Sequence, residues 1–197
     1  MHKFIVLQVF ALVLCVGANK CFAQEYEISV SPGIISPLDF WYYKEGKVGP
    51  HLGLSFTYLN PKKVFVSSNI SKGRFSYNPA LSELAINGQA FGPESSQVDV
   101  YFFYLGIGKA FAIKENLEWS VNSGFGFYLE NRLAFNTTDP NGMEKRDFMR
   151  DATFPIQTEI KKEIYPKFWL GLKTGVFLTP FYTFGGFHVG PTLSFRL

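Results

Sequence analysis

Two histidines, His51 and His188, are the side chains of this sequence best suited to chemistry. Imidazole nitrogens bind transition metals and accept protons near neutral pH, so such a pair suggests a shared metal site or a catalytic histidine. A metal site also needs cysteine or carboxylate ligands at suitable spacing, and neither histidine has them nearby. We therefore favour two inward-facing side chains without a catalytic role, and predict no metal, no cofactor and no catalytic residue.

A second candidate site consists of charged residues that alternate with apolar ones. They are Glu27, Glu118, Glu159, Lys161, Lys173 and Arg196. If their segments are strands, each charge faces the same side as its polar neighbours, which is the interior of a closed sheet. An unpaired charge in such an interior costs roughly several kcal/mol, so we expect these charges to pair. A water-filled ion path is the alternative.

Four consecutive aromatic residues form the third candidate site, inside the connection Ser36–Lys47. They are Phe40, Trp41, Tyr42 and Tyr43. Aromatic side chains concentrate where a membrane meets water, so we favour an interfacial collar. An exposed apolar patch that binds a partner is the alternative.

The N-terminal segment 1–23 has the pattern of a secretory signal peptide. Lys3 supplies the charged start, Phe4–Val16 is almost wholly apolar, and Cys21-Phe22-Ala23 ends in small residues at the positions read by signal peptidase. We therefore expect cleavage before Gln24 and a single domain over residues 24–197.

Composition narrows the class of protein that follows. The chain has 197 residues, 47% of them hydrophobic and 18% charged, and both cysteines, Cys15 and Cys21, lie in the predicted signal. Lys3 and Lys20 are two of its 19 basic residues, and the other 17 nearly balance its 16 acidic residues, which argues against a nucleic-acid partner. No later run of 18 apolar residues predicts a membrane helix.

The elements that position these residues are predicted to be strands. Apolar and polar residues alternate with a period of two in eight segments, separated by Gly, Pro, Asn and charged residues. The segments are Tyr26–Ser31, His51–Tyr58, Val64–Ser71, Tyr101–Gly108, Glu118–Leu129, Phe154–Lys161, Leu170–Leu178 and Phe187–Leu197. In the fourth segment, Phe102 and Tyr104 blur the alternation.

The connections between these segments alternate in length. Short links are predicted at 60–62, 112–116 and 162–167, and longer ones at 36–47, 76–96, 130–150 and 179–184. This is the pattern of an up-and-down barrel with short turns at one end. Counting back from the turn at 162–167 predicts that Glu159 faces Gly171 across the sheet, with Lys173 diagonal to Glu159.

Alternation alone fits either a soluble barrel with an apolar interior or a membrane barrel with a polar one. The polar positions are mostly Gly, Ser, Thr and Asn, which suit a narrow lumen better than a water-exposed surface. Aromatic residues near the turn ends suit a membrane interface, namely Tyr58, Trp119, Phe168 and Phe195. We therefore predict an all-β, eight-stranded antiparallel transmembrane barrel.

Residues 24–197 resemble the small eight-stranded outer-membrane barrels of OmpA/OmpX type, and the Gly-, Tyr- and Phe-rich strands resemble the outer-membrane β-barrel domain proteins of Bacteroidota. The last strand, apolar at every second residue, is similar to the signal read by the barrel-assembly machinery, although it ends in Leu197 with its aromatic at Phe195. The resemblance implies the bacterial outer membrane, with both termini periplasmic and the long loops extracellular. It also implies contact with outer-membrane lipid and lipopolysaccharide.

Three classes of function remain open for such a barrel, because the fold does not fix the activity. We favour a non-enzymatic protein that is structural or binds another envelope protein through its loops or lipid face. A lipid A-modifying enzyme is the first alternative. The deacylases of this kind place His and Ser two residues apart, whereas Val189 and Gly190 follow His188. A narrow channel is the second.

Overall fold

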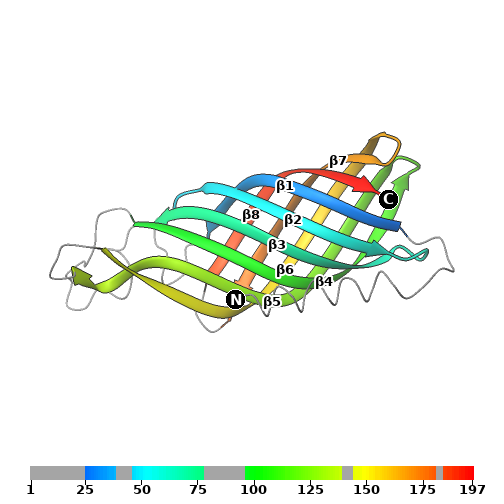
Figure 1. Cartoon of the computed structure of the whole chain (residues 1–197). Coiled ribbons are helices and arrows are strands. Elements are labelled where there is room, and N and C mark those ends of the chain that lie inside the picture. Colours follow the sequence, from blue (N-terminus) through cyan, green and yellow to red (C-terminus); the bar gives the residue numbers. More distant parts are fainter. Residues whose placement is uncertain (1–24, 39–45, 78–95, 139–143, 181–183) are drawn as a thin grey trace.

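The chain folds into a closed antiparallel barrel in which each strand pairs with the next and the last pairs with the first (Figure 1). A computed structural model describes residues 25–38, 46–77, 96–138, 144–180 and 184–197. The strands are β1 (Glu25–Pro37), β2 (Gly49–Leu59), β3 (Val64–Tyr77), β4 (Ser96–Lys114), β5 (Leu117–Thr138), β6 (Glu144–Tyr165), β7 (Phe168–Thr179) and β8 (Phe184–Arg196). The predicted fold class, an all-β barrel of eight strands, is confirmed. The predicted signal peptide lies outside the described residues.

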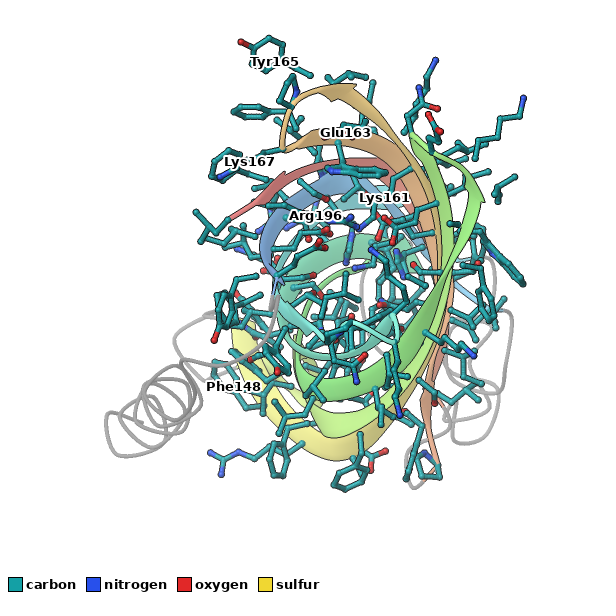
Figure 2. The ribbon with its side chains drawn as sticks, turned by 90° about the vertical axis from the view of Figure 1, so that its right-hand side faces the viewer. Phe148, Lys161, Glu163, Tyr165, Lys167 and Arg196 are labelled. Carbon is teal, nitrogen blue, oxygen red and sulfur yellow. The ribbon has the colours of Figure 1, made fainter. Side chains whose placement is uncertain are left out.

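The two faces of the barrel wall follow the alternation in the sequence. Outward-facing apolar residues stay exposed, as with Ile28 at 48% and Leu105 at 60%, whereas the inward-facing Ser29 and Asn69 are buried. Viewed along the barrel, Lys161 and Arg196 point into the lumen (Figure 2). A wall that is apolar outside and polar inside suits surrounding lipid, because a protein in water has the opposite arrangement. Among the described residues no helix is both long and apolar enough to cross a membrane.

Short turns join the strands at one end of the barrel, where β1 starts and β8 ends (Figure 1). Two of these turns contain a lysine with positive φ, Lys63 at 61° and Lys167 at 71°. Each turn is fixed by a side chain: Asn60 Oδ1 accepts a hydrogen bond from Val64 N at 2.9 Å, and Glu163 Oε1 accepts one from Lys167 N at 3.0 Å. All three predicted short links are present, but two are shorter than predicted, because β4 runs to Lys114 and β6 to Tyr165.

Aromatic pairs on the outer surface mark the same end. Trp119 stacks on Phe111 with ring centroids 5.2 Å apart, and Phe168 lies 4.8 Å from Phe195. Tyr58 adds a third such contact, 5.6 Å from Tyr26. Such rings suit the level at which a membrane meets water.

At the opposite end, one predicted connection is wrong over most of its length. The sequence predicts a long link over 130–150, but β5 runs to Thr138 and β6 starts at Glu144, so these two strands extend as a paired hairpin past their neighbours (Figure 1). The charged and polar residues of this stretch hide the alternation that marks the other strands. Likewise β3 continues beyond the predicted Ser71 to Tyr77.

Candidate functional site

The lumen is the candidate site, because the structure directs all six predicted inward charges into it. Near the short-turn end, four of them form a connected set that we call the ionic layer: Glu27 of β1, Glu118 of β5, Lys161 of β6 and Arg196 of β8. Each of the four is less than a tenth exposed.

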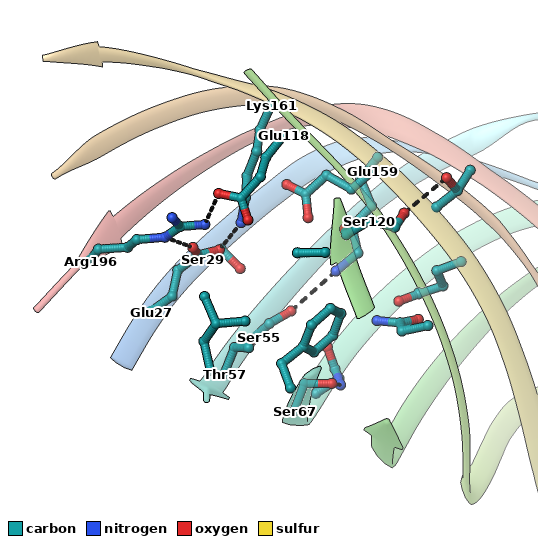
Figure 3. Close-up of a pocket in the computed structure, with 18 residues that line it drawn as sticks. Glu27, Ser29, Ser55, Thr57, Ser67, Glu118, Ser120, Glu159, Lys161 and Arg196 are labelled. Carbon is teal, nitrogen blue, oxygen red and sulfur yellow. Dashed lines mark hydrogen bonds and ion pairs between the residues drawn. The ribbon is translucent and has the colours of Figure 1, made fainter. Parts of the chain in front are cut away.

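Glu27 and Arg196 are the centre of the ionic layer (Figure 3). Glu27 Oε1 accepts a hydrogen bond from Lys161 Nζ at 2.5 Å, and Glu27 Oε2 accepts one from Arg196 Nε at 2.7 Å. The same guanidinium reaches Glu118 Oε2 at 2.6 Å. Since β1 lies next to β2 and β8 only, the bond from Lys161 to Glu27 crosses the lumen, as does the bond from Arg196 to Glu118 on β5. Two cations and two carboxylates thus connect opposite walls.

Trp169 of β7 is part of the same region, although the sequence argument did not single it out. It is 6% exposed, and the Arg196 guanidinium lies 4.2 Å from its ring centroid. A guanidinium over an indole face is a favourable cation–π contact. The phase of β7 gives the signal, because Trp169 shares the inward face with Gly171 and Lys173.

Lys173 and Glu159 lie closer in register than predicted. They are directly opposite each other, not diagonal, because β6 runs on to Tyr165 and the turn before Phe168 is tighter than the predicted link at 162–167, which displaces the pairing by two residues. The expected ion pair between them is absent from the contacts of the described residues. Lys173 Nζ instead donates to Ser55 Oγ at 3.3 Å, and Glu159 Oε1 accepts no hydrogen bond.

On the side of the ionic layer away from the short turns, polar side chains surround a cavity of about 30 Å³ (Figure 3). This is room for about two water molecules. We call this part of the lumen the polar chamber. Several oxygens that line it accept no hydrogen bond from the described residues, among them those of Asn69, Asn122, Gln157 and Glu159. Water in the chamber would satisfy these acceptors, since each water molecule donates two hydrogen bonds.

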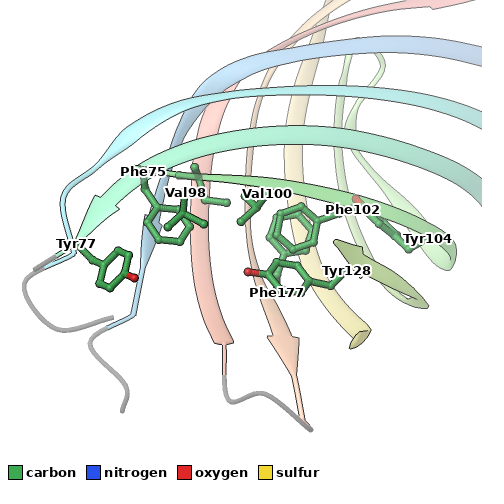
Figure 4. Packing of buried hydrophobic residues seen from close by; sticks show 9 residues of the cluster. Phe75, Tyr77, Val98, Val100, Phe102, Tyr104, Tyr128 and Phe177 are labelled. Atoms are coloured by element: carbon green, nitrogen blue, oxygen red, sulfur yellow. The ribbon is translucent and has the colours of Figure 1, made fainter. Parts of the chain in front are cut away.

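The other half of the lumen is filled mainly by apolar side chains, which the sequence argument did not predict. Two carboxylates are buried among them, Glu130 opposite Val100 and Asp151 opposite Tyr128. Nine buried residues pack there (Figure 4), and we call them the aromatic layer: Ile35, Phe75, Tyr77, Val98, Val100, Phe102, Tyr104, Tyr128 and Phe177. Phe102 of β4 stacks on Phe177 of β7 with centroids 3.9 Å apart and planes inclined by 15°. Phe102, Phe177 and Val100 are 0% exposed, so this layer leaves no bore.

The two histidines belong to this packing. His188 stacks on Phe177 with centroids 5.0 Å apart, and His51 lies 5.1 Å from His188. A row of four contacting rings therefore crosses the lumen, in the order Phe102 of β4, Phe177 of β7, His188 of β8 and His51 of β2. On its polar side, His188 Nε2 lies 3.1 Å from the Gln157 amide nitrogen. Within the described ranges, no group of three or more His, Cys, Asp or Glu is arranged to hold a metal.

The structure describes the predicted lumenal residues but not the predicted aromatic patch. The structure brings the six inward charges into one lumen and the two histidines into one contact. Phe40, Trp41, Tyr42 and Tyr43 lie outside the described residues, so the aromatic patch stays a prediction. The signal for the aromatic layer was present in the sequence, because Phe102 and Tyr104 make both faces of β4 apolar where the other strands have one polar face.

This fold and lumen define an eight-stranded barrel of the outer-membrane type. Several solved structures share the fold, among them the following two. Ail, the attachment invasion locus protein of Yersinia pestis, solved with the heparin analogue sucrose octasulfate, has a TM-score of 0.59 at 11% identity over 89% of this chain and 100% of that one. Neisserial surface protein A has a TM-score of 0.59 at 7% identity over 87% of this chain and 97% of that one.

The sequence itself matches no protein-family model and no curated protein. The resemblance to small outer-membrane barrels is thus confirmed in its fold, whereas the resemblance to Bacteroidota proteins stays a prediction.

Proposed function

We propose that this chain is a non-enzymatic protein of the bacterial outer membrane that acts through its outward-facing surfaces. The observation that carries the proposal is the lumen, which the ionic layer closes in one half and the aromatic layer in the other. The described side chains leave a solute no open path through the lumen, so the surfaces proposed for function are the connections beyond the strands and the lipid-facing wall. The partner we propose there is another envelope protein.

We propose an orientation in the membrane from the difference between the two ends of the barrel. Outer-membrane barrels of this kind have short periplasmic turns and longer extracellular connections. The start of β1 and the end of β8 would then lie on the periplasmic side, and the extended β5–β6 hairpin outside the cell. Lipid and lipopolysaccharide would surround the apolar wall, and the barrel-assembly machinery would insert the chain.

The six predicted lumenal charges serve this proposal as a plug. Glu27, Glu118, Lys161 and Arg196 neutralise one another across the lumen, while Glu159 and Lys173 face each other in the polar chamber. In a protein interior, the charges of the ionic layer are tolerated because each has a partner of opposite charge, and water in the polar chamber would solvate Glu159. A plug of this kind has no selectivity role.

Conductance and lipid chemistry test the proposal against its two alternatives. The purified full-length protein in planar bilayers is expected to give no conductance steps, and lipid A from cells with and without the protein is expected to have the same mass spectrum. Regular conductance steps would favour the channel. A change in acylation or phosphorylation of lipid A would favour the enzyme.

Co-purification from native membranes tests the partner directly. A second envelope protein is expected to remain bound in stoichiometric amount after mild solubilisation. Replacing Phe40, Trp41, Tyr42 and Tyr43 by serine should release it if the aromatic patch is the binding surface. The matched control is the conservative variant Tyr42→Phe with Tyr43→Phe, which keeps the rings and should keep the partner. Recovery of the native barrel alone would overturn the partner proposal.

A further inference from the structure

The seam between β1 and β8 is the one that closes the barrel, and its backbone pairing is interrupted in the middle. The pairs run from Glu27↔Arg196 to Val30↔Leu193 and resume from Ile34↔Val189 to Pro37↔Gly186. The register is the same on both sides of the gap, so no bulge accounts for the three missing pairs. By contrast, the β2–β3 seam pairs without a break from His51↔Gly73 to Leu59↔Phe65.

Two prolines explain the gap. In the continuous register, Pro32 of β1 faces Pro191 of β8. In an antiparallel ladder, every second pair of residues exchanges two N–H···O=C bonds. Leu197 N donates to Tyr26 O at one end of the seam, and Leu38 N donates to Gly185 O at the other. Both bonds belong to even-numbered residues, Tyr26 in β1 and Leu38 just after it, so the pair that contains Pro32 is also one that should exchange two bonds.

Proline has no N–H, so neither bond at this pair can form. A single proline at such a position removes one bond and leaves its partner able to donate. Two prolines facing each other remove both, and two carbonyl groups lose their donors in the lipid-facing part of the wall. Unsatisfied backbone groups in hydrocarbon are strongly unfavourable, which is why barrels pair all their strands.

Few side chains cover the gap on its lumen side. Gly33 and Gly190 face each other there, and a Cβ atom on either would overlap the backbone of the opposite strand. No side chain of these two residues therefore covers the gap from inside. The side-chain contact across it is a long hydrogen bond, 3.4 Å, from Ser31 Oγ to Thr192 Oγ1. Outside, both prolines face lipid and are exposed.

We propose that this part of the β1–β8 seam is a lateral opening, where the wall of the barrel parts locally while both ends of the seam stay paired. The ionic layer holds one end, because Arg196 of β8 is bonded to Glu27 of β1. The resumed ladder from Ile34 to Pro37 holds the other. When the seam parts, the hydroxyl groups of Ser31 and Thr192 become reachable from the lipid side, and water from the lumen reaches the two carbonyl groups.

Thiol labelling in lipid vesicles tests this opening, because both cysteines of the chain lie in its first 23 residues. The probe is N-ethylmaleimide, which is small, uncharged and membrane-permeant. Ser31→Cys places a thiol behind the gap. Ser71→Cys is the matched control, since Ser71 is also an inward-facing serine with 5% exposure but lies behind unbroken ladders. Val30→Cys, which faces lipid, gives the rate for an open site. The protein is expressed without residues 1–23 and refolded, and each variant is checked for heat-modifiable gel mobility.

The expected result is that Ser31→Cys reacts on the order of tenfold to a hundredfold faster than Ser71→Cys, which is the effect of two missing backbone hydrogen bonds. Adding Pro191→Val restores one N–H to the seam and should slow the reaction of Ser31→Cys toward that of Ser71→Cys. Equal rates for the two cysteines would overturn the proposal, and so would a fast rate that Pro191→Val leaves unchanged.

Hydrogen exchange on the unsubstituted barrel gives a readout that needs no cysteine variant. The amide protons of Val30, Ile34, Val189 and Leu193 flank the gap, and they are expected to exchange faster than amides in the middle of the β2–β3 seam. Protection equal to that of the β2–β3 amides would contradict a lateral opening, even if the labelling rates differed.

Discussion

The two halves of the lumen close the same tube by different physical means. In the ionic layer, a few directional bonds join strands that are not neighbours, and each charge depends on one or two specific partners. In the aromatic layer, rings and aliphatic side chains fill the space, and contacts such as that of Phe102 with Phe177 have no polar partner to lose. The comparison shows that a narrow barrel can be sealed by charge pairing or by packing, and that the two seals should fail in different ways.

The largest effect is expected from Arg196→Met, which breaks the ionic layer. Removing the guanidinium leaves Glu118 without its cation and Glu27 with one partner in place of two. We expect a loss of about 4 kcal/mol in the free energy of unfolding, because breaking a buried ion pair leaves an uncompensated charge. Urea unfolding in lipid vesicles measures it.

The control for this change is the double variant Arg196→Met with Glu118→Gln. It keeps the ion pair of Glu27 with Lys161 and leaves no uncompensated charge, so part of the loss should be recovered. A double variant as unstable as, or less stable than, Arg196→Met alone would show that the guanidinium acts through its contact with Trp169 and not through charge.

Phe177→Ala breaks the aromatic layer and should have a slightly smaller effect. The ring of Phe177 is 0% exposed and contacts both Phe102 and His188. Its removal leaves a void, for which we expect a loss of about 3 kcal/mol. Phe177→Leu is the control and should lose less than half as much, because it keeps most of the volume. Equal losses for the two variants in urea unfolding would argue against packing as the cause.

A third, weaker effect is expected from Lys173→Met in the polar chamber. Lys173 faces Glu159 in register but donates its hydrogen bond to Ser55, and water in the adjoining cavity can solvate the remaining carboxylate. We therefore expect a loss of about 2 kcal/mol, below that of Arg196→Met. Adding Glu159→Gln should recover most of it. If the single variant keeps the unfolding midpoint of the native barrel, the chamber is wet enough to carry charge without pairing.

The smallest expected effect is the coupling free energy between substitutions in the two layers. Arg196 and Phe177 share no contact partner among the described residues, so their effects should add to within about 0.5 kcal/mol in the double variant. Conductance on the same samples should remain absent in each folded single variant, because the other layer still closes the lumen. A coupling well above this value would mean that the two layers act as one unit.

The sequence predicted the number of strands and the face on which each residue lies, because a period of two directly encodes burial on one side of a sheet. Glu27, Ser55 and Thr192 face inward as their phase requires. The direction in which each side chain faces is thus a local property, which can be predicted from one segment without knowledge of its neighbours.

The partners inside the lumen were less predictable, for two physical reasons. Contacts such as Lys161 with Glu27 join strands that are not neighbours, and their level depends on how the whole barrel is staggered. The position of a turn has the same reach: β6 runs on to Tyr165, beyond the predicted start of the link at 162, and Glu159 therefore lies opposite Lys173 and not Gly171. The aromatic layer escaped prediction because a polar lumen was assumed along the full length, although Phe102 already argued against it.

The bond between Glu27 and Arg196 also has a consequence for the order of folding. The two residues are 169 positions apart, on the first and last strands, so they meet only when the sheet closes on itself. Until then, the charges of the ionic layer stay hydrated, so they cannot be buried strand by strand. Such a distant contact is formed slowly. Burial of charge and closure of the ring are therefore a single late event, and a chain that lacks either end strand should stall as an open sheet with its charges still hydrated.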